Sequence, residues 1–393
     1  MKNGKNFPFS LPFILDGATG TELNKRGMKS GDCTEKFVLE NPQILTQLQK
    51  EYINSGSDAV LAATFGANIP TLLRHGFDVK EYKDICRRLF DITKEAAGDK
   101  KVGGDISPTG LMLKPYGETD PEEIYEIYRK QAECLLDCGV DFFFVETMLS
   151  AAEARLALMA IRSLSDNIPV FVSLTVNETG RTMNGDSMGA SLLCMLPYDV
   201  TAFGCNCSIG PDVVSKALKE AAPVAKLYGI PLIAKPNAGM PVQDENGTHF
   251  PLTPSDMAEA VDGLTGLGAG IFGGCCGTTP EHIKAIACAA RNTGKERFSD
   301  TEDIDDGIYV STSREFSKID ENAEYLKIDS ESEDDIYDLL DECDAEDILY
   351  FELGSGAGEL LVSMDSFIPN PISVRGAEDE IKILERKLCR KVR

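Results

Sequence analysis

The first 294 residues alternate between short apolar runs and longer stretches in which apolar residues recur at helical spacing. The short runs have the length of buried parallel strands, and the longer stretches have the pattern of amphipathic helices. The predicted strands are residues 13–16, 58–64, 101–106, 141–146, 170–175, 202–206, 231–235 and 270–274. The predicted helices are residues 41–55, 82–97, 121–138, 151–163, 188–196, 212–227, 254–267 and 280–291.

Eight strands that are each followed by a helix predict an α/β protein with a (β/α)8 TIM barrel. An open doubly wound sheet is the alternative, but such sheets usually have fewer strands and often a phosphate-binding glycine motif after the first strand. Gly17-Ala18-Thr19-Gly20-Thr21 follows the first predicted strand without the GxGxxG spacing. The pattern therefore favours the barrel.

The pattern changes after Gly294. Residues 295–307 are polar and acidic, which is typical of a linker. Beyond them we expect strands at residues 308–311, 325–328 and 348–353 and helices at 333–343 and 377–390. The predicted organisation is a barrel over residues 1–294, an acidic linker over 295–307 and a small acidic α/β module over 308–393.

Charge narrows the possible partners. The net charge is −25, and residues 299–393 contribute 27 acidic and 10 basic residues, a net of −17 that leaves −8 for the rest. An acidic surface argues against nucleic-acid binding. No apolar run reaches the roughly 18 residues of a membrane span, and the polar start lacks a signal sequence. We therefore expect a cytoplasmic protein whose twelve cysteines are reduced thiols or metal ligands.

The candidate chemistry centres on Cys275 and Cys276, which stand between glycines at the end of the last predicted barrel strand. Adjacent residues of a strand point to opposite faces, but a glycine-flanked strand end can turn so that both sulfurs converge. Such convergence indicates a metal site. The alternative is a pair of core cysteines beside a glycine-rich turn.

A third thiolate has two candidates, Cys205 and Cys207, at the end of the sixth predicted strand. Their side chains would point to the same face of the strand, so spacing alone does not choose between them. Cys207 is preferred because it lies further toward the loop. Three thiolates would leave one zinc coordination position open, as in catalytic sites. Zinc with three thiolates carries a net charge of about −1, which suits holding a substrate thiolate for attack on an electrophilic carbon better than making hydroxide.

Several motifs together resemble the homocysteine S-methyltransferase family, especially the homocysteine-binding barrel of cobalamin-dependent methionine synthase. The resemblance covers roughly residues 10–293. The motifs are Asp16–Leu23, Gly104–Gly110, Thr175–Thr182, Asn206-Cys207, Pro236–Pro241 and Gly273–Pro280. It implies a zinc-bearing barrel that methylates L-homocysteine to L-methionine, with Cys207, Cys275 and Cys276 as ligands.

The resemblance also implies substrate contacts. Asp16 and Glu146 match acidic positions near the homocysteine amino group, and Gly17 and Ala18 offer backbone N–H groups to its carboxylate. A carboxylate that ends an apolar strand, as Glu146 does, is costly unless it is used or paired. Thr64 lies at another strand end in the matching region.

The sequence departs from the methionine synthase pattern in two ways. Ala62-Ala63-Thr64-Phe65 replaces the usual Thr-Asn-Thr-Phe, so a polar group is missing at Ala63. The folate-binding and cobalamin modules of methionine synthase also have no counterpart in the 393 residues.

Three functions remain open at this point. One is a homocysteine methyltransferase whose donor is methylcobalamin on a separate corrinoid protein. Another uses a small-molecule donor such as S-methylmethionine. The third is a non-catalytic zinc-binding regulatory subunit, which the open coordination position argues against.

Overall fold

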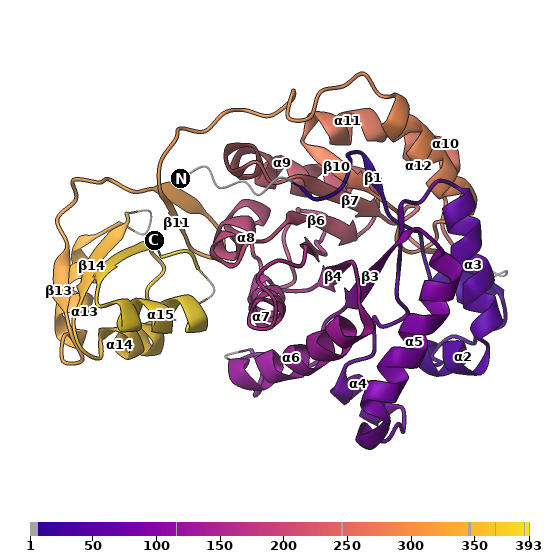
Figure 1. The fold of residues 1–393 in the computed structure, drawn as a ribbon. Coiled ribbons are helices and arrows are strands. Elements are labelled where there is room, and N and C mark those ends of the chain that lie inside the picture. The colour runs from indigo at the N-terminus through magenta and orange to yellow at the C-terminus, as the bar shows by residue number, and fades with distance from the viewer. Residues whose placement is uncertain are drawn as a thin grey trace.

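The barrel strands form one parallel sheet in a computed structural model that describes residues 7–114, 116–244, 247–344, 347–365, 367–388 and 390–392. The strand order is β1-β10-β7-β6-β5-β4-β3-β2 (Figure 1). The strands are β1 (Phe13–Ile14), β2 (Ala59–Leu61), β3 (Lys101–Ile106), β4 (Phe142–Met148), β5 (Val170–Leu174), β6 (Ala202–Cys207), β7 (Leu232–Pro236) and β10 (Ala269–Phe272). The predicted (β/α)8 barrel is confirmed.

Helices surround this sheet on its outer side (Figure 1). Between the strands and after them lie α1 (Gly20–Lys25), α2 (Thr34–Glu40), α3 (Pro42–Asn54), α4 (Ile69–Arg74), α5 (Tyr82–Ala97), α6 (Pro121–Cys138), α7 (Ala151–Arg162), α8 (Met188–Met195), α9 (Pro211–Tyr228), α10 (Pro254–Glu259), α11 (Val261–Gly266) and α12 (Pro280–Asn292). The loop after β7 adds a short antiparallel pair, β8 (Val242–Asp244) and β9 (Gly247–His249), which the sequence pattern did not predict.

Carboxylate side chains join β1 to β2, where the sheet closes. The Ile14 N–H donates to Oδ2 of Asp58 at 2.9 Å, and the Asp58 N–H donates to the Ile14 carbonyl at 2.7 Å. The Leu61 N–H donates to Oδ2 of Asp16 at 2.9 Å. Asp16 is therefore held in place by the seam of the barrel.

Phenylalanine rings fill the barrel interior below the strand ends. Phe142 and Phe171 stack with ring centroids 4.8 Å apart, and Phe13 lies edge-on to both. Side chains alternate along a strand, so Phe142 and Phe144 point inward and Glu146 follows them at the carboxyl end of β4. These rings occupy the interior of the barrel, and sites of barrel proteins generally lie at the carboxyl ends of the strands.

Residues 308–392 form additional α/β structure beside α7 and α8 (Figure 1). An antiparallel hairpin, β11 (Tyr309–Ser311) and β12 (Phe316–Lys318), precedes a parallel sheet of β13 (Leu326–Ile328), β14 (Leu349–Leu353) and β15 (Ile372–Gly376). Its helices are α13 (Glu333–Glu342), α14 (Ala357–Met364) and α15 (Glu378–Lys387). The sequence pattern missed β12, α14 and β15, and the division of the chain at residues 294 and 307 stays a prediction.

The start of α14 explains one of these omissions. Glycines are poor helix formers, and Gly356 directly precedes α14 while Gly358 stands in its first turn. The buried Glu380 carboxylate accepts the Gly356 N–H at 2.7 Å and the Gly358 N–H at 2.8 Å. A carboxylate distant in sequence therefore caps the helix, a contact that local pattern does not reveal.

Arg155 of α7 connects the barrel to α15. Its buried guanidinium donates to the Leu388 carbonyl just after α15 and to the Tyr198 hydroxyl at 3.0 Å. Tyr198 in turn donates to the Glu385 carbonyl at 2.6 Å. A cation at the carboxyl end of a helix also interacts favourably with its dipole.

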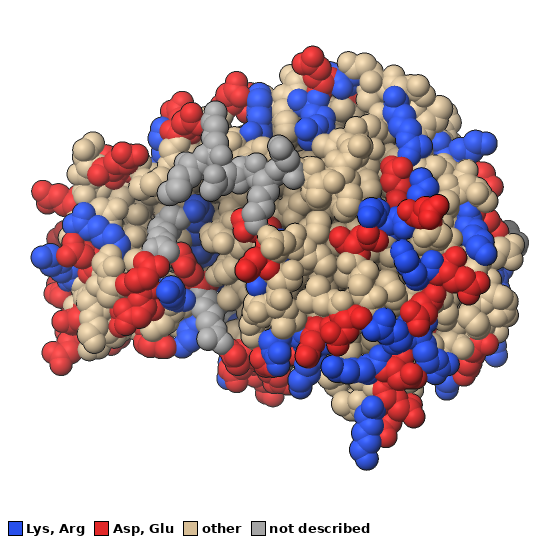
Figure 2. Space-filling model, in the orientation of Figure 1, with Lys and Arg blue, Asp and Glu red and all other residues tan. Residues whose placement is uncertain are grey.

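His282 lies in the first turn of α12, where it is buried and its Nδ1 accepts the Thr279 N–H at 3.1 Å. Figure 2 shows acidic and basic side chains interspersed on the visible face. Among the described residues, no helix is long and apolar enough to cross a membrane.

Replacing Arg155 with alanine should lower the free energy of unfolding by about 2–3 kcal/mol, because charge-assisted hydrogen bonds to buried acceptors are lost. Urea unfolding measures this loss, and hydrogen exchange should show faster amide exchange in α15. Arg88→Ala is the matched control: its guanidinium meets Asp84 at 3.8 Å on the surface, so a change within about 0.5 kcal/mol is expected. Equal effects of the two variants would contradict the anchoring role.

Candidate metal and substrate site

Three cysteines converge at the carboxyl ends of the barrel strands. Cys207 ends β6, and Cys275 and Cys276 follow β10. Their ligand atoms all lie within 4.8 Å of one another, and in the described part of the chain they are the one such group of potential ligands. The structure thus brings together the three cysteines selected from the sequence.

A backbone turn at Cys207 separates it from Cys205. Cys207 has φ of 59° and Ser208 has φ of 58°, a left-handed conformation that is uncommon for residues other than glycine. The turn interrupts the regular alternation of side-chain directions along β6. Cys207 therefore reaches the other sulfurs, while Cys205 stays fully buried in the apolar layer between sheet and helices. Thr175 supports the turn, because its Oγ1 accepts the Ser208 N–H at 3.2 Å.

Close backbone packing shapes the loop that carries Cys275 and Cys276. A Cβ atom on Gly274 would lie 2.3 Å from Oγ1 of Thr278, and Gly277 has φ of 80°. The Cys275 N–H donates to the Pro236 carbonyl at 2.8 Å. Glycine on both sides of the cysteine pair is thus required by the turn, as the sequence indicated.

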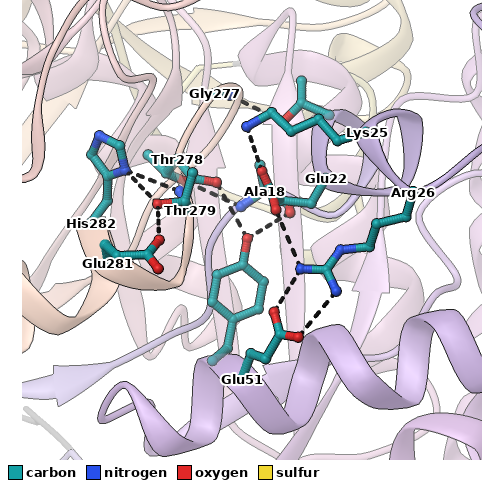
Figure 3. A network of polar contacts seen from close by, with 12 residues as sticks. Ala18, Glu22, Lys25, Arg26, Glu51, Gly277, Thr278, Thr279, Glu281 and His282 are labelled. Carbon is teal, nitrogen blue, oxygen red and sulfur yellow. Dashed lines mark hydrogen bonds and ion pairs between the residues drawn. The ribbon is translucent and has the colours of Figure 1, made fainter.

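The loop after β1 is tied to the cysteine loop. The Tyr52 hydroxyl donates to the Ala18 carbonyl at 2.7 Å and to the Thr278 carbonyl at 3.3 Å. Figure 3 shows Ala18 beside Thr278 of the cysteine loop. The Ala18 N–H donates to Oγ1 of Thr278 at 3.1 Å. A Cβ atom on Gly17 would lie 2.7 Å from the Tyr52 ring, so glycine permits this contact.

A cavity of about 560 Å³ opens beside the sulfurs. Its lining includes five buried charged residues. One of them, Glu35 of α2, accepts the Gly66 N–H at 2.7 Å. The other four, Asp16, Asp105, Glu146 and Lys235, are called the charged floor below. The Lys235 ammonium lies 3.1 Å from Oε2 of Glu146, and both side chains are almost fully buried. The floor therefore contains three carboxylates and one ammonium group.

Asn206 links the charged floor to the cysteines. Its amide Nδ2 lies 3.3 Å from Oε2 of Glu146 and 3.9 Å from the Cys275 sulfur. Its Oδ1 accepts the Thr147 N–H at 2.7 Å and the Ser173 hydroxyl at 2.6 Å. Because both ends of the amide are engaged, its orientation is fixed.

Burial dominates the acid–base properties of the floor. It raises the pKa of Asp16 to about 7, although Lys235 opposes the shift. Burial likewise raises the pKa of Asp105 and of Glu146. For Lys235, burial lowers the pKa, but Glu146 and the other nearby acidic groups outweigh it, so the pKa rises and the ammonium stays charged.

The three cysteine thiols shift one another's pKa values. Hydrogen bonds from Cys275 and Cys276 lower the pKa of Cys207, and the pKa values of those two thiols are raised. One thiolate stabilised by two thiols is the expected state without a cation, because three adjacent negative charges repel each other. Three deprotonated thiols need a metal ion, and three soft sulfur donors fit zinc.

The sequence-based substrate residues divide into two groups. Asp16, Gly17, Ala18 and Glu146 line the cavity, whereas Thr64 does not. Thr64 is fully buried, and its hydroxyl donates to the Asp105 carbonyl at 2.9 Å and accepts the Asp105 N–H at 3.2 Å. Thr64 thus holds the backbone of Asp105 in place, and a direct contact of Thr64 with the substrate stays a prediction.

Sequence reasoning missed Asp105 and Lys235. Both are charged residues near the ends of otherwise apolar strands, the same signal that identified Glu146. Ala63, the position at which the family resemblance predicts a polar side chain, lines the cavity with a methyl group.

Comparisons with known proteins place the barrel among relatives of similar sequence. A family model described as homocysteine S-methyltransferase matches residues 13–290. The methionine synthase of Mycobacterium tuberculosis is 33% identical over 298 residues, which cover 71% of this chain and 24% of that protein. For the methionine synthase of Mycobacterium leprae the identity is 32% over 295 residues, covering 70% and 24%. The chain thus spans about a quarter of the length of these curated relatives.

A solved structure shares the fold. The homocysteine methyltransferase MmuM from Escherichia coli, in its metallated form, superposes with a TM-score of 0.59 at 24% identity. The match covers 70% of this chain and 95% of that chain.

The raised pKa of Asp16 predicts a pH dependence of stability. The pKa of Asp16 is about 7 in the folded protein and 3.8 in the unfolded chain. Protonated Asp16 therefore stabilises the folded protein fully below pH 3.8, and this contribution is lost as the pH rises through 7. Urea unfolding of the metal-free protein gives the free energy of unfolding, and the value for wild type minus the value for Asp16→Asn should fall by about 1.4 kcal/mol per pH unit between about pH 5 and 6.5. Parallel pH profiles of the two proteins would show that Asp16 titrates normally.

Proposed function

This chain belongs to the homocysteine S-methyltransferase family, and we propose on that premise that it transfers a methyl group to the thiol of L-homocysteine, giving L-methionine. The observation that carries the proposal is the convergence of Cys207, Cys275 and Cys276 beside a cavity with a charged floor. The sulfurs suit a metal that holds a thiol, and the floor suits the charged end of an amino acid.

Cys207, Cys275 and Cys276 are the proposed zinc ligands. Structural zinc sites have four protein ligands, and a three-ligand site keeps one position for substrate. Zinc bound there would supply an electron-rich centre that favours the thiolate form of the substrate sulfur as the nucleophile. The surrounding chain fixes the three sulfurs through the turns at Cys207 and Gly277.

The charged floor and the loop after β1 are the proposed recognition elements. The carboxylates of Asp16 and Glu146 attract the substrate ammonium. The Gly17 N–H faces the substrate carboxylate, and Ala18 supports the same loop, because its own N–H is engaged by Thr278. In the transfer, the substrate thiol loses its proton, a sulfur–carbon bond forms and the bond between the methyl group and its carrier breaks.

The donor we propose is a methyl group carried by a separate corrinoid protein. Twelve large apolar side chains of the described residues are exposed, and seven of them lie in segments that follow barrel strands. Those seven, called the apolar rim below, are Phe65, Met112, Tyr116, Leu149, Met183, Met240 and Val242. Large contiguous apolar surfaces mark interaction sites with other macromolecules or ligands, and we propose that the apolar rim contributes to such a surface.

Metal analysis tests the ligand assignment. The wild-type protein should bind roughly one zinc per chain, and Cys276→Ser should lose most of it, because the remaining two thiolates hold zinc weakly. Cys205→Ser is the matched control: it removes a cysteine from the same part of the barrel and should keep the metal. Equal zinc in wild type and Cys276→Ser would refute the assignment.

Activity assays test the reaction itself. L-homocysteine should be methylated when a methylated corrinoid protein or free methylcobalamin is supplied, and S-methylmethionine tests the small-molecule alternative. Absence of methyl transfer to L-homocysteine with all three donors would contradict the proposed function.

A substitution in the apolar rim tests the protein-borne donor. Met183→Glu should raise the KM for a methylated corrinoid protein by about tenfold, since a charge would be buried at the interface. The KM for free methylcobalamin should stay unchanged. Ile308→Glu, an exposed apolar position outside the rim, is the control. If both variants behave alike with both donors, the rim is no docking surface.

A further inference from the structure

The loop after β5 connects the sulfur site with the apolar rim. At its start, Oγ1 of Thr175 accepts the Ser208 N–H at 3.2 Å, and the Val176 N–H donates to Oγ of Ser208 at 3.0 Å. Further along, Met183 and Asn184 line a cavity of about 120 Å³ together with residues of the loops after β3 and β4. One loop thus supports a turn of the sulfur site and also forms part of the barrel mouth.

Asp186 organises the second half of this loop. Its Oδ2 accepts the Thr182 hydroxyl at 2.8 Å and the Ala151 N–H, at the start of α7, also at 2.8 Å. Between Thr182 and Asp186 stands Met183, whose side chain is 65% exposed. Packing of this side chain therefore contributes little to holding the loop tip, and the tip depends on what supports the backbone around it.

The turn between β11 and β12 supports this half of the loop from outside the barrel. The Ser187 N–H, at the end of the loop, donates to the Ser313 carbonyl at 2.8 Å. The Arg181 guanidinium donates to the Arg314 carbonyl at 3.0 Å. Both acceptors belong to the hairpin, and the two donors flank Met183 in the sequence. The hairpin thus grips the loop on either side of its exposed tip.

The hairpin is itself fixed on two sides. Phe316 of β12 packs against α8, because a Cβ atom on Gly189 would lie 2.8 Å from its ring, and it lies edge-on to Tyr309 with ring centroids 5.8 Å apart. Figure 1 shows β11 beside α8. At the other edge, the Ser311 N–H donates to the Lys391 carbonyl at 2.9 Å near the chain end. The hairpin is therefore a rigid support for the loop.

The hairpin also lies beyond residue 290, where the match with the family model ends. We infer that it is a positioning element: it holds the second half of the loop after β5 so that Met183 and Asn184 keep their places at the barrel mouth for docking of the protein-borne methyl donor. The inference rests on the proposed function, because it concerns that donor. It gives the C-terminal structure a part in the reaction without contact to the reacting atoms.

Hydrogen exchange on the zinc-loaded protein tests whether the hairpin holds the loop. Phe316→Ala loosens the hairpin, so the amides of residues 180–187 should exchange about fivefold faster than in wild type or more. Arg181→Ala removes one of the two bonds directly and should act on the same amides. Phe367→Ala is the matched control: it removes an exposed ring elsewhere in the C-terminal structure and should leave these amides unchanged.

Steady-state kinetics test the consequence for the reaction. Phe316→Ala should raise the KM for a methylated corrinoid protein by about fivefold, roughly the cost of ordering one backbone residue when the donor binds. The kcat, the KM for L-homocysteine, the KM for free methylcobalamin and the zinc content should each change less than about twofold, because Thr175 and Val176 still hold Ser208. A merely destabilised protein would instead lose zinc or kcat.

A double variant shows whether the hairpin acts through the loop. If it does, the donor KM of Arg181→Ala combined with Phe316→Ala should stay within about twofold of the larger single effect, whereas independent effects would multiply. Multiplied effects, unchanged exchange of the loop in both single variants, or an unchanged donor KM with faster exchange would each overturn the inference.

The proposed function fails in a different way. Wild-type protein that transfers no methyl group to L-homocysteine from any donor would contradict the proposed function, and the exchange data would still decide whether the hairpin holds the loop. Methyl transfer from S-methylmethionine alone would contradict the protein-borne donor and, with it, the inference.

Discussion

Three sulfur atoms within 4.8 Å of one another are the constraint on which the site depends. Regular strand geometry cannot satisfy it, because adjacent residues alternate between faces. The chain meets the constraint with left-handed residues at Cys207 and Ser208 and with a glycine at position 277. Each non-glycine residue in that conformation costs of order 1–3 kcal/mol and persists only where the surroundings hold it. Here the hydrogen bond that Thr175 Oγ1 accepts from the Ser208 N–H and the packed barrel below provide that support.

The buried residues of the charged floor also depend on one another's positions. A buried ion pair is a weak source of stability, but removing one partner leaves an uncompensated charge. Lys235 and Glu146 are therefore interdependent, and Asn206 connects Glu146 to Cys275. The sulfur site and the floor thus form one polar unit on top of an apolar barrel. Its fixed orientation is the preorganisation that binding and transfer require.

The fold could be predicted from the sequence because each barrel strand is a short apolar run followed by a helical pattern. The cysteine cluster could be found because glycines flank Cys275 and Cys276. The alternation of side chains along a strand could not distinguish Cys205 from Cys207. The left-handed turn at Cys207 and Ser208 contains no glycine, so the sequence does not indicate it. Asp105 and Lys235 carry the same signal as Glu146, a charged residue near the end of an apolar strand, but the sequence does not show that the three residues line one cavity. The contact of the Thr64 hydroxyl with the backbone of Asp105 was likewise not predictable, because the two residues lie on different strands.

Zinc X-ray absorption spectroscopy of the zinc-loaded protein tests the central claim most directly, because it counts sulfur neighbours at the Zn–S distance of about 2.3 Å. The account predicts three sulfur ligands in the protein alone and four after L-homocysteine is added. Fewer than three sulfurs in the protein alone, or a sulfur count that L-homocysteine leaves unchanged, would contradict it.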